Sequence, residues 1–163
     1  MEIGDRATLQ WYRFDEFSSA LLYDVLRLRQ GNFVVEQRSP YPDLDGLDER
    51  AEHLLLRVDG ELAGYLRVIP YPDEKRVAIG RVAVTAPLRR HGLARLLMAQ
   101  ALAHCRQDYA DCAMTLSAQA HLVPFYESLG FRATSPLYDD YGVPHVDMVS
   151  SHPAVGGLRQ NGV

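Results

Sequence analysis

The stretch from residue 76 to residue 102 is the part of the sequence that most restricts the fold. Residues 76–85 alternate in polarity and are rich in Val and Ile, which predicts a strand that ends at Pro87. A long helix is expected from Gly92, because apolar residues then recur along one face: Leu93, Leu96, Leu97, Ala101 and Leu102. A strand, a tight turn and a long crossover helix favour a mixed α/β architecture.

The turn between this strand and this helix has the features of an anion site. Arg89, Arg90 and His91 lie directly before the expected helix start. A helix N-terminus offers unpaired N–H groups and the positive end of the helix dipole, which suit a pyrophosphate. Gly92 allows close backbone approach and small Ala94 keeps the next position open. The alternative is a solvated basic loop that only starts a helix.

The remaining pattern predicts one domain, residues 1–151, with a flexible Gly-rich tail at 152–163. Strands are expected near residues 7–14, 53–58, 62–69, 76–85, 113–117, 131–138 and 143–150. Helices are expected near residues 19–34, from 92 onward and near 121–129, the first capped by Ser18 or Ser19. The order is β-α-β-β-β-α-β-α-β-β: an α/β fold with a single central sheet flanked by helices.

Composition limits the classes of partner. The 163 residues carry a formal net charge of −4, which argues against a duplex-binding protein. The sequence lacks a GxxxxGK[ST] motif, which excludes a P-loop nucleotide hydrolase, and it lacks a GxGxxG motif after a strand, which argues against a dinucleotide-binding domain. No apolar run is long enough to span a membrane, and the acidic N-terminus predicts no signal peptide. Cys105 and Cys112 are expected to be free thiols, so we expect a cytoplasmic protein.

Two motifs resemble signatures of the GNAT superfamily of acyl-CoA-dependent N-acyltransferases. Residues 89–94 fit the pattern Arg/Gln-x-x-Gly-x-Gly/Ala after a Val-rich strand, and residues 124–131 are similar to a second signature ending in Phe-Tyr-x-x-x-Gly-Phe. Further segments resemble the ElaA-like branch of this superfamily: 33–37, 40–41, 43–46, 80–82, 119–122 and 142–145. The similarity runs from about Leu22 to Met148 and implies the mixed, mostly antiparallel GNAT sheet.

The resemblance implies a site for acetyl-CoA as co-substrate, with no metal. The cofactor would lie where the strands at 76–85 and 113–117 splay apart, its pantetheine arm beside the backbone and its pyrophosphate on the helix start. The implied cofactor-binding residues are Val82, Ala83, Val84, Arg89, Arg90, His91, Gly92, Leu93, Ala94, Arg95, Gln119, Phe125 and Tyr126. The implied reaction is direct transfer of acetyl from the thioester to a primary amine of an unidentified small molecule or peptide.

The sequence identifies the catalytic residues less directly than the cofactor-binding residues. Tyr126 matches the helix tyrosine of the family and is the predicted general acid, although it could instead only pack and hydrogen-bond the cofactor. Many relatives place a carboxylate on the central strand, but residues 76–85 contain none. Glu36 is the tentative base, with a salt-bridged carboxylate as the alternative. Three histidines are further candidates, each of which could equally be structural: His53, His121 and His145.

An acidic loop contains Asp43, Asp45, Asp48 and Glu49. It could attract a cationic amine, or it could be an ion-pair scaffold with Arg27, Arg29 and Arg67. Its spacing does not match a calcium loop. A non-catalytic acyl-CoA-binding regulatory module is the alternative function, and a partner-binding domain without a nucleotide site is a third. Nucleic acid and membrane partners are not expected, and a monomer and a homodimer both remain open.

Overall fold

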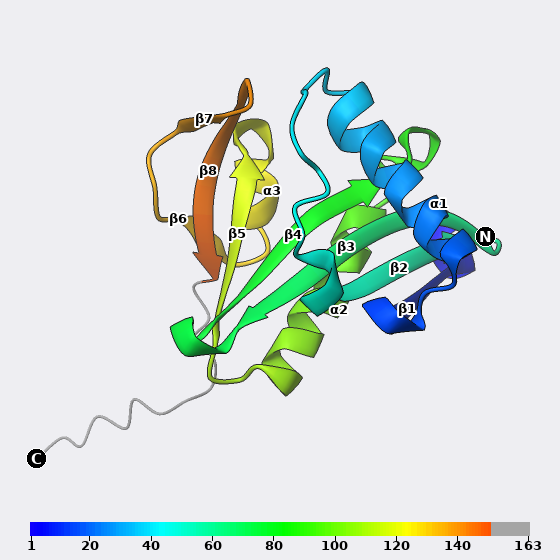
Figure 1. Cartoon of the computed structure of the whole chain (residues 1–163), viewed down its shortest axis with the longest axis horizontal. Helices are drawn as coiled ribbons and strands as arrows, with labels where there is room; N and C mark the ends of the chain where they lie inside the picture. The colour runs from blue at the N-terminus through cyan, green and yellow to red at the C-terminus, as the bar shows by residue number, and fades with distance from the viewer. Residues whose placement is uncertain (151–163) are drawn as a thin grey trace, which may run out of the picture.

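A computed structural model describes residues 1–150, so the predicted tail at 152–163 and the domain end at 151 lie outside the described residues. Three α-helices and eight strands form an α/β fold (Figure 1). The helices are α1 (Ser19–Gln30), α2 (Leu93–Asp108) and α3 (Val123–Glu127). The strands are β1 (Ala7–Arg13), β2 (Glu52–Val58), β3 (Glu61–Tyr71), β4 (Arg76–Val84), β5 (Ala113–Gln119), β6 (Phe131–Ala133), β7 (Tyr138–Asp140) and β8 (Val143–Ser150).

The strands form one mixed sheet, as predicted. Its order is β1-β2-β3-β4-β5-β8-β6, and β7 pairs with β8. Every pairing is antiparallel except that of β4 with β5, which is parallel. Helix α2 forms the crossover connection between β4 and β5. Parallel strands need such a long connection, whereas antiparallel strands can be joined by a short turn.

The sheet has a separate apolar core on each face. Leu54 and Leu56 of β2 pack in the larger core with α2, whereas Leu55 between them packs with Val25 of α1. In Figure 1, α1 crosses the front of the sheet and α2 lies behind it. Because successive side chains of a strand point to opposite faces, a strand covered on both faces is apolar at every position. This accounts for the unbroken leucine run at 54–56.

Local sequence patterns predicted several element boundaries correctly. The Ser18 side chain accepts a hydrogen bond from the Leu21 N–H at 3.1 Å and caps α1. Asp59 and Gly60 form the β2–β3 turn, both with positive φ. After Gln30 the helix continues as a π-helical turn, Gly31–Val35, which reaches the predicted helix end.

The C-terminal part differs in detail from the sequence-based prediction. The single strand expected at 131–138 is two short strands, β6 and β7, separated by residues 134–137. Pro136 lies in this gap and has no N–H for a sheet hydrogen bond. The helix expected at 121–129 is α3 alone, preceded by a 3-10 turn at Ala120–Leu122. Within residues 1–150, no helix is both long and apolar enough to cross a membrane.

Packing of α2 on the sheet predicts a measurable loss of stability. Leu97 is fully buried, so Leu97→Ala should lower the free energy of unfolding by about 2–5 kcal/mol through lost burial and a residual cavity. Urea unfolding monitored by circular dichroism measures this change. Leu44→Ala is the matched control, because Leu44 is 62% exposed and should change stability by about 0.5 kcal/mol or less. Equal effects of the two substitutions would contradict this assignment of the core.

Candidate active site

The site begins where β4 and β5 separate. The two strands pair only over Arg76–Ala113, Val77–Met114 and Ala78–Thr115. Beyond Ala78 they diverge, as Figure 1 shows toward the arrowheads of both strands. β4 keeps its other neighbour, since Ala83 still pairs with Tyr65 of β3. The edge of β4 that faces β5 is therefore available to an extended ligand.

A bulge in β4 lies at this divergence. The register with β3 shifts between Gly80–Arg67 and Ala83–Tyr65, and Arg81 has a φ of 55°. A positive φ is unfavourable for a residue with a Cβ, so other contacts must hold Arg81 in this conformation. Bulges re-aim side chains, and here Arg81 and Val82 both line the pocket between the strands.

The predicted anion site lies at the N-terminus of α2 and the turn at residues 89–92 before it, which we call the cradle. Gly92 precedes the helix with a φ of +79°, and a Cβ built on it would meet no atom within 4 Å. The first helical hydrogen bond joins the Leu96 N–H to the Gly92 carbonyl at 3.0 Å, so the backbone N–H groups of residues 93–95 precede this ladder. Open space beside these N–H groups fits an anion at the positive end of the helix dipole.

The arginines around the cradle have different roles. Arg89 is anchored: its Nε donates to the Val84 carbonyl at 3.0 Å, and its Nη2 donates to Glu36 at 2.7 Å. Arg90 is exposed and has a positive φ of 65°. Arg95 donates to the Ser128 hydroxyl at 3.0 Å and lies over the Phe125 ring, which links α2 to α3. Arg90 is thus the one of these three whose side chain has no hydrogen bond within residues 1–150.

Two residues predicted for this site have internal partners. The Val84 carbonyl accepts hydrogen bonds from Asn32 at 3.2 Å and from Arg89 at 3.0 Å, so this carbonyl is already saturated. Glu36 was the tentative base, but its hydrogen bonds to Arg89 lower its pKa and make it a weaker proton acceptor. Glu36 follows the π-helical turn and holds Arg89 in the turn before α2 instead of lining the pocket.

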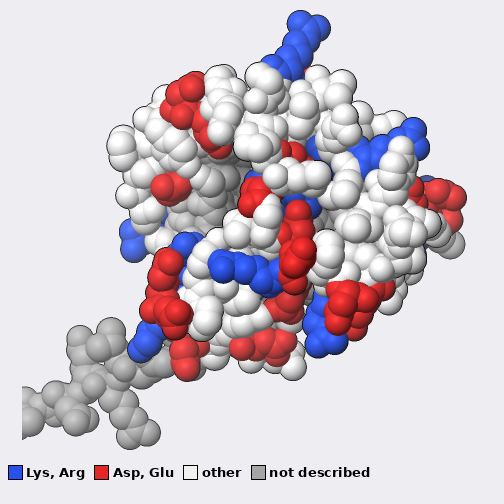
Figure 2. All heavy atoms as spheres, in the orientation of Figure 1, with Lys and Arg blue, Asp and Glu red and all other residues white. Residues whose placement is uncertain are grey.

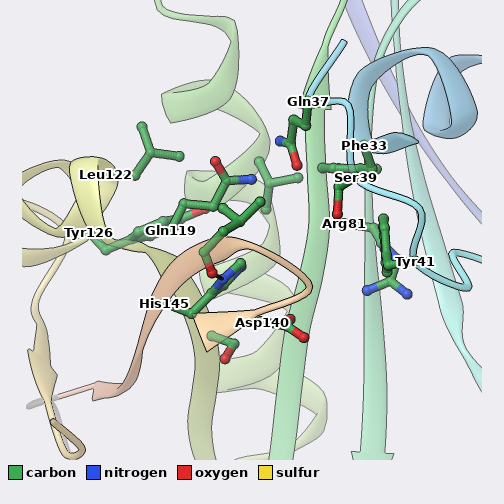
Figure 3. Close-up of a pocket in the computed structure, with 13 residues that line it drawn as sticks. Phe33, Gln37, Ser39, Tyr41, Arg81, Gln119, Leu122, Tyr126, Asp140 and His145 are labelled. Carbon is green, nitrogen blue, oxygen red and sulfur yellow. Dashed lines mark hydrogen bonds between the residues drawn. The ribbon is translucent and has the colours of Figure 1, made fainter. Parts of the chain in front are cut away.

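A pocket of about 110 Å³ lies between the diverging strands. We call it the cleft pocket; Figure 3 draws its lining. Its lining residues are Phe33, Gln37, Ser39, Tyr41, Arg81, Val82, Ser117, Gln119, Leu122, Tyr126, Asp140, Val143 and His145. A larger groove of about 590 Å³ shares Arg81, Ser117, Asp140 and His145 with it and continues along the sheet. The site is therefore a narrow pocket that opens into a wider groove.

Tyr126 lies in the wall of the cleft pocket, on α3. Its side chain is buried between Phe125 and Phe131, whose rings are 5.0 and 6.3 Å from its own. Burial raises the pKa of Tyr126 to about 12. The hydroxyl is therefore protonated at neutral pH, as a proton donor must be. Gln119 and Phe125, also predicted for the site, lie beside it, Gln119 in the pocket lining and Phe125 in ring contact.

The acidic loop is an ion-pair scaffold, one of the two roles considered for it. Arg29 of α1 pairs with Asp43 at 3.0 Å and with Asp48 at 2.7 Å, although its own side chain is only 1% exposed. Arg67 of β3 pairs with Asp48 at 2.9 Å and with Asp45. Among the described residues, neither Arg27 nor Glu49 takes part in these ion pairs.

The scaffold also reaches the bulge. Arg81 donates to the Asp43 carboxylate at 2.8 Å and to the Asp43 carbonyl at 3.0 Å. Three arginines thus face three aspartates, so the charges within this network balance. Figure 2 shows that acidic and basic side chains are interspersed over this face of the molecule. The network secures the unfavourable conformation of Arg81, which the sequence did not reveal.

The three candidate histidines have separate environments. His53 is buried, and both of its ring nitrogens have partners: the Tyr65 hydroxyl is 2.6 Å from Nδ1, and the Asp48 carbonyl oxygen is 2.9 Å from Nε2. Burial lowers the pKa of His53. His121 is exposed in the 3-10 turn before α3. His145 of β8 lines both the cleft pocket and the groove. Only His145 of these three faces the site.

Sequence reasoning missed several lining residues. Arg81 and Asp140 were not assigned a role, nor were Gln37, Ser39 and Ser117. The segment Gly80-Arg81-Val82 was visible as a motif, but its bulge depends on pairing with β3 and on the loop at 43–48. Asp140 enters the site through β7, a strand that the sequence pattern merged with β6.

Comparisons with known proteins identify the family of this chain. Residues 30–151 match the family described as the acetyltransferase (GNAT) domain. The chain is 40% identical over 136 residues to ElaA of Escherichia coli, which covers 82% of this chain and 89% of ElaA. The crystal structure of that ElaA superposes with a TM-score of 0.84, at 37% identity over 89% of this chain and 99% of the other. A structure titled as an acyl-CoA N-acyltransferase from Pseudomonas aeruginosa gives a TM-score of 0.83, at 36% identity over 89% and 99%.

The fold and these comparisons identify an acyltransferase. The chain belongs to the GNAT acetyltransferase family and resembles its ElaA-like members. It is an N-acyltransferase of a family that uses acyl-CoA, which sets aside the readings as a regulatory module or a domain without a nucleotide site.

The ion-pair scaffold predicts a defined loss of stability in acid. Burial acts to raise the pKa of Asp45, but hydrogen bonds and charge from Arg67 outweigh it and hold the pKa at about 2, below the ordinary 3.8. A depressed folded-state pKa stabilises the protein above about pH 4, and this contribution is lost as the pH falls from about 4 to about 2. Asp45→Asn should remove this part of the pH dependence and lower stability at pH 7.

Urea unfolding at a series of pH values from 2.5 to 7 measures this effect. Asp59→Asn is the matched control, because Asp59 pairs with Arg6 at an exposed site where its side chain is 55% accessible. If both variants changed the pH dependence equally, the stabilising role assigned to Asp45 would be wrong.

Proposed function

We propose that this protein is an acetyl-CoA-dependent N-acetyltransferase that acetylates a primary amine of a small molecule or peptide. The observation that carries the proposal is the open edge of β4 beyond Ala78, which leads to the N-terminus of α2. An amide-rich pantetheine arm needs backbone groups of this kind, and the diphosphate that follows it needs a helix start. The acyl-CoA chemistry of the family supports the same arrangement.

The chain offers specific groups to each part of acetyl-CoA. The backbone of Val82 and Ala83 would pair with the pantetheine arm, since the Val84 carbonyl is already bound by Asn32 and Arg89. The N–H groups from Arg90 to Arg95 would hold the pyrophosphate, with the Arg90 and His91 side chains exposed beside it, since the Arg89 N–H already donates to the Ala86 carbonyl. When bound, the co-substrate supplies a thioester carbonyl that an amine can attack.

The cleft pocket has room for the reacting groups. Its volume of about 110 Å³ accommodates an acetyl group and the head of an amine. Tyr126, in the wall of this pocket, is the proposed proton donor to the departing sulfur.

The two cysteines support a reducing, cytoplasmic location. Cys105 and Cys112 are both free thiols. Burial raises the pKa of Cys105 to about 12, so this thiol is unreactive. The oligomeric state stays a prediction of monomer or homodimer.

The cradle is tested by introducing negative charge at its glycine. Gly92→Glu should abolish CoA binding, measured by isothermal titration calorimetry, because a carboxylate would face the diphosphate. Gly60→Glu is the matched control: Gly60 also has a positive φ (+84°) and open space around its Cα, but it lies in the β2–β3 turn. Retained CoA binding in Gly92→Glu, or equal loss in both variants, would refute the assignment of the cradle.

The proposed role of Tyr126 as general acid is tested by removing its hydroxyl. Tyr126→Phe should lower kcat for amine-dependent thiol release from acetyl-CoA by about 10²-fold or more, with little change in the KM for acetyl-CoA. The assay uses a panel of primary alkylamines and lysine-containing peptides. Tyr23→Phe, at a tyrosine that is 69% exposed, should leave kcat unchanged. An unchanged kcat in Tyr126→Phe would show that Tyr126 only packs and does not act as the proton donor.

A further inference from the structure

We propose that His145 is the general base of this enzyme and takes the proton from the acceptor's ammonium group at its Nε2 atom. This inference rests on the proposed N-acetyltransferase function and identifies the proton acceptor that the reaction needs. An alkylamine is almost entirely protonated at pH 7, because such ammonium groups have a pKa of about 10. An ammonium has no lone pair, so it cannot attack a thioester before it loses a proton.

The hydrogen bonding of His145 fixes its tautomer. Its Nδ1 lies 2.8 Å from the Val143 carbonyl oxygen. A carbonyl only accepts hydrogen bonds, so Nδ1 must carry the proton. In the neutral ring the other nitrogen, Nε2, then has a free lone pair. The ring is further held by stacking on Tyr138 of β7, with centroids 6.1 Å apart and planes at 27°. The Val143 carbonyl and the Tyr138 ring thus hold the imidazole with Nε2 free to accept a proton.

The position of His145 places this lone pair at the reaction site. His145 pairs with Gln119 at the end of β5, on the opposite side of the divergence from Val82. Figure 3 shows His145 projecting into the gap between β5 and β4, in the pocket whose wall contains Tyr126. His145 also lines the wider groove, through which an acceptor can arrive without passing the phosphate cradle.

The charged and titratable groups around His145 favour an incoming cation. On β4, Arg81 is neutralised by Asp43 and Asp45. On β8, Asp147 accepts hydrogen bonds from Ser117 of β5 at 2.8 Å and from Tyr138 of β7 at 2.6 Å. The remaining carboxylate is Asp140 of β7, which has no ion pair within residues 1–150 and lines both hollows. Tyr126 of α3 and Tyr41 of the 36–47 loop complete the titratable lining. An ammonium can therefore bind beside Asp140 before it is deprotonated.

The other candidate bases are engaged elsewhere. The carboxylate of Glu36 is bound to Arg89 and does not line the pocket. Both ring nitrogens of His53 have protein partners in the interior. His121 is exposed outside the pocket lining. His145 alone of these residues combines a free nitrogen with a place in the cleft.

The proton and bond changes balance as follows. Nε2 of His145 takes one proton from the ammonium, and the neutral amine forms a C–N bond with the thioester carbonyl carbon. The C–S bond then breaks, and the Tyr126 hydroxyl gives its proton to the departing sulfur. Tyr126 regains a proton from the nitrogen of the adduct, which becomes the amide nitrogen, and His145 releases its proton to solvent. The net products are the amide, CoA thiol and one proton.

The test compares His145→Asn with His121→Asn. Asparagine can keep the hydrogen bond to the Val143 carbonyl but cannot act as a base, and His121 is the matched exposed histidine. The acceptors are 2-phenylethylamine, 1,4-diaminobutane and methoxyamine, the last being so weakly basic that it is neutral at pH 7. Thiol release from acetyl-CoA is followed from pH 6 to pH 9, with the uncatalysed rate subtracted.

With the two alkylamines, His145→Asn should lose about 10²-fold or more in kcat/KM at pH 7. Its kcat/KM should rise about tenfold per pH unit across the range, since only the neutral amine then reacts. The wild type should level off at the upper pH values instead. With methoxyamine the two proteins should have similar kcat/KM. His121→Asn should match the wild type throughout, and all variants should bind CoA equally.

Two results would overturn the inference and leave the proposed function standing: unchanged kcat/KM for alkylamines in His145→Asn, or equal losses for alkylamines and methoxyamine. Absence of amine-dependent thiol release by the wild type would overturn the proposed function and this inference together. A second readout does not depend on activity. Long-range ¹H–¹⁵N spectra of the wild type should show neutral His145 protonated at Nδ1, and protonation at Nε2 would refute the assignment.

Discussion

Arg81 is held in a left-handed conformation in the middle of β4, and the cleft depends on that conformation. A φ of 55° at a residue with a side chain costs of order 1–3 kcal/mol, so it persists only where surrounding contacts enforce it. Asp43 and Asp45 supply those contacts by binding the Arg81 guanidinium. The resulting bulge directs Arg81 and Val82 into the space that opens when β5 leaves β4. The unfavourable conformation of Arg81 and the open edge of β4 therefore occur together at the point where β5 leaves β4.

The segment from α1 to the acidic loop connects both ends of the proposed cofactor site. Arg29, at the end of α1, is buried with Asp43 and Asp48, and breaking such a buried pair costs about 3–5 kcal/mol. The π-helical turn that follows α1 places Asn32 on the Val84 carbonyl and Glu36 against Arg89. π-Helical turns are often found at functional sites. One stretch of chain therefore holds the bulge and the turn at Arg89 in a fixed relation.

The site divides into two halves, which are joined by the short parallel pairing of residues 76–78 with 113–115 and by the contacts of Arg95 with Ser128 and Phe125. The half formed by β4 and α2 offers backbone groups suited to an acyl-CoA. The half formed by β5, α3 and β8 contributes Tyr126 and His145, the side chains proposed to move protons. Since acyl transfer joins a bound thioester to an incoming amine, the space between the halves is where both substrates can meet.

The sequence by itself determined the elements whose signals are local: the strand before Pro87, the helix start at Gly92, the Ser18 cap and the Asp59–Gly60 turn. These follow from backbone preferences of neighbouring residues, and the two GNAT motifs, residues 89–94 and 124–131, are likewise short continuous segments. Only the tertiary structure decided that Glu36 binds Arg89, that Arg81 takes a positive φ and that His145, of three histidines, faces the cleft. Glu36 and Arg89 are 53 residues apart and Arg81 and Asp43 are 38 apart. Which groups become partners over such separations depends on sheet register and helix packing, which no local pattern encodes.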